Sequence, residues 1–409
     1  MNISLPELLA PAGNREKLTT ALTYGADAVY LGGPALNLRA PSAGFSWDEL
    51  AEGLRLTHEA GARAYVCMNA LPRQEQMPAV RDALERLSEF HGNQAPDGLI
   101  IADPGVLALA RRILPEMPLH LSTQANTANA ESAAFWQEMG VSRVNLAREL
   151  SLRSMGAIAR QCPDLELEAF VHGAQCMAIS GRCMLSAHMN GRSANQGLCT
   201  HPCRFQYKTT AVRLEESTRQ GQDTWEAVEE DGHTSIFAPE DLCLIKYVPW
   251  FMRTGLAALK IEGRMKSGGY LVHAVDAYAT AMADFRAGIF RPGLYLDELM
   301  NTASRPLGTG FFLPGRKALY GQAEAPRPIL ARVLARRADN AWEVAVRHRW
   351  NVDRPITVLK PGLKRPIIAA GDYALEKLDG EQVDVIHSGM TIVLRCESKD
   401  ILENLYLRA

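Results

Sequence analysis

Residues 5–270 alternate short apolar runs with amphipathic stretches of helical periodicity. Eight apolar runs can be recognised, and they begin at Pro6, Ala26, Ala62, Asp97, Pro118, Ser142, Leu165 and Leu256. Each run is apolar enough to be buried on both faces, as the strands of a parallel sheet are. Strands and helices in this order predict an α/β fold, a (β/α)8 TIM-like barrel. A doubly wound open sheet is the alternative, because the number of strands does not exclude it.

The pattern is interrupted after the seventh run by an insertion, residues 173–237, which is rich in cysteine at its start. The helix due after this strand is therefore expected at residues 240–253. RFQYKTTAVRLEE and TWEAVEEDGHTSIF, separated by the polar STRQGQD, predict a β-hairpin within the insertion. We assign residues 1–290 to the barrel with its insertion and 291–325 to a linker punctuated by proline and glycine. Residues 326–409 hold short strands spaced by turns, which predict a small antiparallel β-barrel.

Composition limits where such a chain works and what it binds. The N-terminus lacks a basic stretch followed by an apolar one, and no apolar run approaches the roughly 18 residues of a membrane span. We therefore expect a cytoplasmic protein with no membrane partner. The net charge of −2 gives no overall signal for nucleic acid, so a basic surface must be local. The C-terminal barrel offers either such a surface or an ordinary solvated one, with Arg332, Arg336, Arg337, Arg347, Arg349, Lys360, Lys364 and Arg365.

Half of the eight cysteines lie close together, at Cys176, Cys183, Cys199 and Cys203. Without an export signal, clustered cysteines indicate metal binding or catalysis more than disulfides. Four thiolates can hold a tetrahedral zinc ion or an iron–sulfur cluster, and buried hydrophobic cysteines are the third possibility. Only Cys199 and Cys203 have zinc-knuckle spacing, so the wide, glycine-rich spacing favours a cubane cluster. Cys243 could replace Cys203 as a ligand, and the isolated cysteines are expected to be structural: Cys67, Cys162 and Cys396.

Polar side chains recur at the ends of the predicted strands, where the active site of a (β/α)8 barrel lies. They are Tyr30, Asn69, Asp103, Gln124, Asn126, Arg148, Glu149, His172, Glu262, Arg264 and Lys266. Each alone is explained by a turn, as at Asp103, or by a paired core group, but a ring of them is costly to bury without a ligand. Arg264 and Lys266, beside Gly268–Gly269 at an expected helix start, predict a site for a carboxylate or phosphate. His172 and Glu262 are the candidates for proton transfer.

The common signatures of hydrolases are missing from the sequence. It contains no G-x-S-x-G elbow, no H-E-x-x-H motif and no P-loop. A convincing Ser–His–Asp order is also missing, although order alone does not exclude a triad. Nothing in the sequence shows how a peptide bond would be cut.

Three long stretches resemble one known family, and the resemblance covers nearly the whole chain. They are ELLAPAGNREKLTTALTYGADAVYLGG, VHGAQCMAISGRCMLSAHMNGRSANQGLCTHPCRFQY and LKIEGRMKS. These stretches look like the signatures of the collagenase-like "peptidase" family of unassigned catalytic type. DGLIIADPGVLALARRILPEMPLHLSTQAN and the small C-terminal barrel most resemble its branch linked to prephenate-dependent 5-hydroxylation of the wobble uridine, position 34, in bacterial tRNA.

Other branches of this family imply what the cysteines do. They act in oxygen-independent ubiquinone hydroxylation and in hydroxylation of a cytidine of large-subunit ribosomal RNA. The ubiquinone branch carries 4Fe–4S clusters on this loop, and Cys176, Cys183 and Cys199 match its ligands best. The fourth ligand is placed differently there. That branch lacks a C-terminal barrel, which favours an RNA substrate here, whereas the segment before LKIEGR is shorter than in the tRNA-hydroxylating members.

Together these features predict an iron–sulfur-dependent hydroxylase of tRNA with prephenate as a co-substrate. The small barrel would bind the anticodon arm through its phosphates, and the unstacked base would enter the mouth of the large barrel. Beside the proton-transfer pair, the residues expected to bind the small anionic metabolite and the base are Arg264, Lys266, Gln124, Asn126, Asp103, Arg148, Tyr30 and Asn69. A metal-dependent peptidase and a non-catalytic RNA-binding factor with a structural cluster are the alternatives.

Overall fold

The computed structural model describes residues 5–34, 44–176, 178–179, 182–190, 192–196, 198–204, 228–230, 233–235, 240–302, 306–313 and 327–409. Its larger part contains eight parallel strands: β1 (Glu7–Ala12), β2 (Ala28–Gly32), β3 (Arg63–Met68), β4 (Gly98–Ile101), β5 (Leu119–Leu121), β6 (Arg143–Asn145), β7 (Glu166–Ala174) and β11 (Ala258–Ile261). Strand β11 pairs with both β7 and β1 and closes the sheet. The predicted barrel is therefore confirmed, and the open-sheet alternative is wrong.

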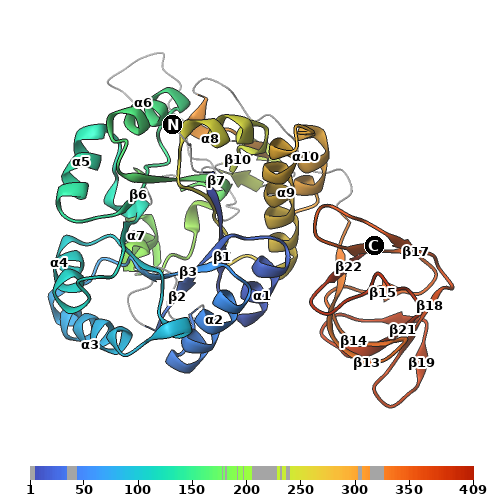
Figure 1. Cartoon of the computed structure of the whole chain (residues 1–409). Helices are drawn as coiled ribbons and strands as arrows, with labels where there is room; N and C mark the ends of the chain where they lie inside the picture. The colour runs from blue at the N-terminus through green and yellow to red at the C-terminus, as the bar shows by residue number, and fades with distance from the viewer. Residues whose placement is uncertain are drawn as a thin grey trace.

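A ring of helices surrounds the barrel (Figure 1). It consists of α1 (Arg15–Thr23), α2 (Trp47–Glu59), α3 (Met77–Ser88), α4 (Pro104–Ile113), α5 (Ala130–Glu138), α6 (Leu152–Gln161), α8 (Val248–Thr254) and α9 (Gly268–Arg286). Six of them begin at a side chain that accepts a backbone N–H of the first turn: Asn14, Ser46, Asp103, Asn129, Ser151 and Ser267. Such caps fix where each helix starts. Among the described helices, none combines the length and apolarity that crossing a membrane requires.

Short 3₁₀ helices lie in the connections: η1 (Gln74–Gln76), η2 (Gly92–Gln94), η3 (Thr123–Ala125), η5 (Ala194–Gln196), η6 (Pro202–Arg204), η7 (Ile245–Tyr247) and η8 (Gly310–Phe312). The η3 turn matters for function because it directly follows β5 at the carboxyl end of the barrel. It ends at Asn126, which has a φ of 62°. Asparagine tolerates this left-handed conformation better than most residues.

Strand β10 (Asp241–Cys243) replaces the first part of the helix expected at residues 240–253. It pairs antiparallel with the last three residues of β7, and β12 (Leu307–Gly308) pairs with β10 on its other side. Strand β7 extends beyond its parallel pairing with β11, so its backbone groups need another partner. The helix starts only at Val248, where Pro249 suits a first helical turn. Cys243 therefore lies on a strand and not in the expected helix.

Only part of the predicted hairpin in the insertion can be compared with the structure. Strands β8 (Val228–Glu230) and β9 (His233–Ser235) pair antiparallel, and both come from the second predicted stretch. The first predicted stretch, apart from its initial residue, lies outside the described residues.

The expected linker is partly structured, and the C-terminal strands form an antiparallel sheet. Helix α10 (Pro292–Met300) packs against α9 because Tyr295 and Leu299 are buried. Eight strands follow in one curved sheet, a half-barrel: β13 (Ile329–Ala338), β14 (Ala341–Val346), β16 (Ile356–Leu359), β17 (Ile367–Ile368), β18 (Tyr373–Glu376), β19 (Gln382–Val383), β21 (Thr391–Cys396) and β22 (Tyr406–Arg408). Strands β15 (Trp350–Asn351) and β20 (Val385–Ile386) pair separately.

A buried group of charges joins the C-terminal sheet to α9 and α10. Arg365 donates to the carboxylates of Asp276 and Glu298, each at 2.8 Å, and Arg408 also contacts Glu298. Asp276 accepts the backbone N–H of Gly362 at 2.7 Å. Burial tends to raise the pKa of Glu298, but His273 and Arg365 outweigh it and hold that pKa below its ordinary value. Glu298 is therefore charged, and the sheet is attached through satisfied buried ion pairs.

We predict that Glu298→Gln weakens this attachment strongly. The change preserves size but leaves two buried guanidinium groups without one of their counter-charges. The free energy of unfolding should fall by about 3–5 kcal/mol, the usual cost of breaking a buried ion pair. Urea-induced unfolding followed by tryptophan fluorescence measures it. Glu381→Gln, which removes the exposed partner of Lys377, should cost less than about 1 kcal/mol. Equal losses in the two variants would contradict the prediction.

Candidate functional site

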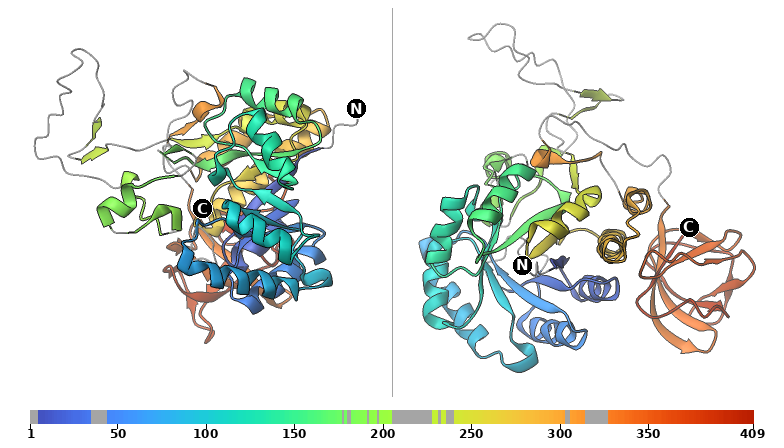
Figure 2. Two further views of the ribbon diagram at one scale, coloured as in Figure 1. Left: turned by 90° about the vertical axis from the view of Figure 1, so that its left-hand side faces the viewer. Right: turned by 45° about the horizontal axis from the view of Figure 1, so that its top comes forward.

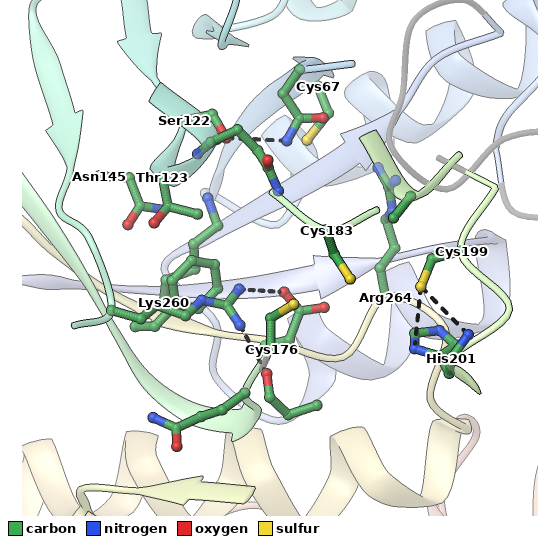
Figure 3. Close-up of a pocket in the computed structure, with 18 of the residues that line it drawn as sticks. Cys67, Ser122, Thr123, Asn145, Cys176, Cys183, Cys199, His201, Lys260 and Arg264 are labelled. Atoms are coloured by element: carbon green, nitrogen blue, oxygen red, sulfur yellow. Dashed lines mark hydrogen bonds and ion pairs between the residues drawn. The ribbon is translucent and has the colours of Figure 1, made fainter. Parts of the chain in front are cut away.

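A pocket, partly open to solvent, lies where the carboxyl ends of the barrel strands meet the cysteine loop (Figure 3). Here the cysteine loop means residues 174–204, which include α7 (Leu185–Asn190). Figure 2 shows α7 beside one end of the barrel instead of in the ring of helices. The barrel contributes Tyr30, Cys67, Asn69, Ser122, Thr123, Gln124, Asn145, Arg148, Phe170, Lys260, Glu262 and Arg264. The loop contributes Ala174, Gln175, Cys176, Cys183, Leu185, Ala194, Cys199, His201, Pro202 and Cys203.

All four predicted loop cysteines line this pocket, and none of them is in a disulfide. Burial raises the pKa of Cys176, and the nearby thiols of Cys183 and Cys199 act in the same direction. Backbone N–H groups donate to two of the sulfurs at 3.4 Å: that of Leu185 to Cys183 and that of His201 to Cys199. The loop therefore turns its sulfur atoms toward one cavity and gives two of them hydrogen-bond donors.

The donor set of this cavity fits a soft metal centre. Thiolates are the ligands of zinc and of iron–sulfur clusters, and N–H donors to sulfur adjust the properties of such clusters. Across the described part of the chain, no three His, Cys, Asp or Glu side chains are already grouped as ligands of one metal ion. The four thiols thus share a cavity without meeting at one point.

Cys243, the alternative fourth ligand, lies elsewhere. It sits on β10 opposite His172 of β7, is 2% exposed and is not among the pocket residues. Burial raises the pKa of its thiol to about 11, as expected of a buried neutral group. Cys67, expected to be structural, instead faces the pocket from β3 (Figure 3). The alternation of side chains along β3 places it beside Tyr65 inside the barrel.

Arg148 connects the base of the cysteine loop to the end of the last barrel strand. Its guanidinium donates to the carbonyl oxygen of Ala174 at 2.8 Å and to the carboxylate of Glu262 at 3.1 Å. It also lies over the ring of Phe170, 3.8 Å from the ring centre. These contacts come from β7, β11 and the turn after β6. Arg148 and Glu262 were both predicted as site residues, and the structure brings them together.

The cation that accompanies Arg264 in the pocket is Lys260, which the sequence analysis missed. Lys260 donates to Glu168 at 2.7 Å and lies over the Tyr30 ring, 4.6 Å from its centre. Lys260 lies in the apolar run LAALKIEGR, which was interpreted only as a buried strand. A lysine within such a run was nevertheless a signal of a functional residue. Lys266 does not line the pocket and instead lies 3.9 Å from Asp241 of β10.

The expected anion site at Gly268–Gly269 is filled by the C-terminal sheet. A Cβ atom on Gly268 would lie 2.2 Å from the hydroxyl oxygen of Tyr406, and one on Gly269 would lie 2.9 Å from Ile329. The two glycines permit this close packing of the sheet against the start of α9. A ligand has no room at this helix start, so the prediction of an anion site there is wrong.

His172 faces away from the pocket. Lys260 pairs with Phe170 and the next residue, Ile261, pairs with His172, so β7 contains an extra residue at this point. Such a bulge reverses the side-chain alternation. The His172 ring consequently packs between Tyr270 and Tyr278 of α9, with ring centres 5.9 and 5.5 Å away. Burial, reinforced by Lys266, lowers the pKa of His172 to about 3.

Three further predicted residues also lie outside the pocket lining. Asp103 caps α4 by accepting the Val106 N–H at 3.0 Å, which is the turn role considered for it. Asn126 ends η3, and Glu149 lies beyond the lining as well. Asn69 and Gln124 do line the pocket, together with three side chains that the sequence analysis did not select: Ser122, Thr123 and Asn145.

We predict that His172 makes stability depend on pH. Its pKa is about 3 in the folded chain and about 6.5 when unfolded, so below pH 6.5 protons favour the unfolded state. Stability present above pH 6.5 should therefore decrease by up to about 1.4 kcal/mol per pH unit as pH falls toward 3. His172→Phe, measured by urea unfolding between pH 7 and 4, should lose about 3 kcal/mol less than the wild type over this range.

The exposed His387 provides the control for this measurement. His387→Gln should follow the wild-type pH dependence, because this side chain stays exposed to solvent when the chain folds. Parallel pH curves for the wild type and His172→Phe would contradict the prediction.

Comparisons with known proteins identify the family of the chain. The family model described as "Peptidase family U32" matches residues 13–320. A "tRNA hydroxylation protein P" from Escherichia coli K12 is 34% identical over 396 residues, covering 87% of this chain and 86% of that protein. The "tRNA hydroxylation protein P1" of Bacillus subtilis 168 is 38% identical, covering 78% and 74%. The "23S rRNA 5-hydroxycytidine C2501 synthase" of Escherichia coli K12 is 30% identical, covering 78% and 47%. The chain therefore belongs to peptidase family U32, the collagenase-like family.

Proposed function

We propose that the chain is a tRNA hydroxylase that places a hydroxyl group on C5 of the wobble uridine, position 34. Its cofactor would be an iron–sulfur cluster, and prephenate would serve as a co-substrate. The observation that carries the proposal is the pocket in which four thiols face polar side chains of the barrel mouth. Relatives with high coverage carry names of tRNA hydroxylation proteins, and an rRNA hydroxycytidine synthase is a more distant match.

The cluster would be held by Cys176, Cys183, Cys199 and Cys203. We prefer Cys203 to Cys243 because Cys203 faces the pocket, whereas Cys243 is buried on β10. Such a cluster supplies redox or Lewis-acid chemistry when bound. The N–H groups of Leu185 and His201 would stabilise the charge of the thiolates.

The protein's own side chains would bind and orient the other reactants. Arg148, Lys260 and Arg264 bring three cations to the pocket, two of which pair with Glu262 and Glu168. An anionic metabolite such as prephenate would bind beside these cations. Glu262 faces the same pocket and is the better candidate for proton transfer. His172 is a poor one, since its pKa of about 3 keeps it neutral at ordinary pH and its ring lies against α9.

Contacts with the anticodon arm would involve fewer basic residues than the sequence suggested. Arg365 is used for docking to Asp276 and Glu298, and Arg347 pairs with Glu16 of α1 at 2.6 Å. Several others of the predicted basic surface are paired with acids of the sheet itself: Arg336, Arg337 and Lys360. Arg349 lies beside Trp350 in a second pocket and is the most suitable phosphate contact.

A peptidase remains the alternative that the family description favours. It predicts metal-dependent cleavage of gelatin by highly purified protein. We expect no cleavage of gelatin. Cleavage that persists after further purification would favour the peptidase.

We predict that deletion of the gene removes 5-hydroxyuridine from tRNA. In a strain without a redundant enzyme, the loss should be almost complete, because no other protein would supply the hydroxyl. Mass spectrometry of nucleosides from digested tRNA measures it. The wild-type gene should restore the modification, whereas Glu262→Gln should restore about a hundredth or less, the usual effect of losing a proton-transfer group. Unchanged 5-hydroxyuridine in the deletion strain would refute the proposed function.

We also predict that the anaerobically purified protein is coloured and contains iron and acid-labile sulfide. Alanine at any of Cys176, Cys183, Cys199 or Cys203 should remove most of the iron, because each would remove one ligand of the cluster. Cys243→Ala and Cys162→Ala, which remove buried thiols outside the pocket, should retain it. Iron analysis and absorption spectra distinguish these outcomes. A colourless zinc protein, or loss of iron in Cys243→Ala but not in Cys203→Ala, would contradict the assignment.

A further inference from the structure

The walls of the pocket divide into two chemically different halves. One half comes from the carboxyl ends of β3, β5 and β6 and is polar but uncharged: Asn69, Ser122, Thr123, Gln124 and Asn145. We call these five residues the neutral wall. The other half carries the charges, with Lys260 from β11, Glu262 and Arg264 from the segment that follows β11, and Arg148 paired to Glu262. Figure 3 shows Ser122, Thr123 and Asn145 on one side, the labelled loop cysteines on the other and Lys260 between them.

The neutral wall is held in place by its own hydroxyl groups. The Ser122 oxygen accepts the side-chain N–H of Asn69 at 3.3 Å and the backbone N–H of Gln124 at 3.3 Å. The Thr123 hydroxyl donates to the carbonyl of Leu146 at 3.1 Å. The hydrogen bond to Ser122 fixes the amide nitrogen of Asn69, and the amide oxygen of Asn69 can accept a hydrogen bond from a ligand.

Three amide oxygens of this wall have no hydrogen-bond partner in the described part of the chain: Asn69 Oδ1, Gln124 Oε1 and Asn145 Oδ1. All three are shielded from solvent, and the Asn145 side chain is only 3% exposed. A buried polar atom without a partner is costly, on the order of 1–3 kcal/mol each. Three such atoms on one wall of a ligand-sized pocket indicate groups that become paired when a ligand binds.

We propose that the neutral wall holds the target pyrimidine through its hydrogen-bonding edge, while Arg148, Lys260 and Arg264 hold the anionic co-substrate. This rests on the proposed function and adds the place and orientation of the base. Uracil presents one ring N–H between two carbonyl oxygens. The ring N–H can donate to one of the three unpaired amide oxygens, and amide NH₂ groups can donate to the two carbonyls. The ribose hydroxyl groups of the nucleotide can donate to the other two oxygens. Enzymes that act on an extruded base read it in this way.

The placement also explains why the two halves are separate. A neutral base needs donors and acceptors without a strong field, whereas a carboxylate needs cations. A base against Asn145 lies across the pocket from the labelled loop cysteines (Figure 3). The charged side chains line the same pocket as the neutral wall and the loop cysteines. The base, the anionic co-substrate and the cluster would therefore share one cavity.

Binding of short RNA tests the proposal without requiring activity. Anticodon stem–loops with uridine or with an abasic site at position 34 are compared by fluorescence anisotropy. Wild-type protein should bind the uridine RNA about tenfold more tightly, as one or two neutral hydrogen bonds provide. Asn145→Leu and Gln124→Met should abolish this preference and leave the affinity for the abasic RNA unchanged. Gln161→Met, an exposed amide on α6, should behave as the wild type does.

Thermal stability separates a binding role from a structural one. Asn145→Leu removes a buried oxygen that has no partner among the described residues, so the melting temperature should stay the same or rise. A lower melting temperature with equal losses for both RNAs would assign Asn145 a structural role and overturn the proposal. An intact base preference in both variants, or none in the wild type, would also overturn it. If the deletion strain lacks 5-hydroxyuridine, such a result refutes the base site and leaves the proposed function standing.

Discussion

The site depends on the guanidinium of Arg148. It joins the carbonyl of Ala174, where the cysteine loop leaves β7, to the carboxylate of Glu262, where β11 ends. Because Arg148 also lies over Phe170, its plane is fixed by the barrel interior as well as by its hydrogen bonds. The loop therefore starts from a defined position although it is long and contains little regular structure. Two further contacts hold the loop against the barrel mouth: Arg182 donates to the carbonyl of Gln124 at 3.0 Å, and the Leu71 N–H donates to the carbonyl of Asn195 at 3.2 Å.

Strand β7 determines which side chains reach that site. Its bulge opposite Lys260 and Ile261 leaves Phe170 facing the pocket and turns His172 toward α9. The residues beyond the bulge then pair with β10, which follows the insertion. One additional residue in a strand thus excludes a histidine from the site and provides a backbone edge that receives the returning chain.

The barrel could be predicted from sequence because each of its strands is a short apolar run. A strand that is buried on both faces has apolar side chains at nearly every position, which makes it easy to recognise. The four cysteines could be predicted as a group because their chemistry is specific. The orientation of His172 could not, since a bulge depends on pairing with a distant strand. Lys260 escaped selection because it lies within an apolar run, and the docking role of Arg365 required partners on α9 and α10.

Buried polarity serves opposite purposes in the two parts of the molecule. Where the C-terminal sheet meets α9, the Glu298 carboxylate accepts hydrogen bonds from His273, Arg365 and Arg408, and Asp276 accepts two backbone N–H groups. Satisfied groups of this kind fix an arrangement and leave nothing for a ligand. On the neutral wall, by contrast, amide oxygens lack partners within the described residues. An unpaired buried oxygen destabilises the free protein. A ligand that donates a hydrogen bond to it removes this cost, and the free energy of binding becomes more favourable.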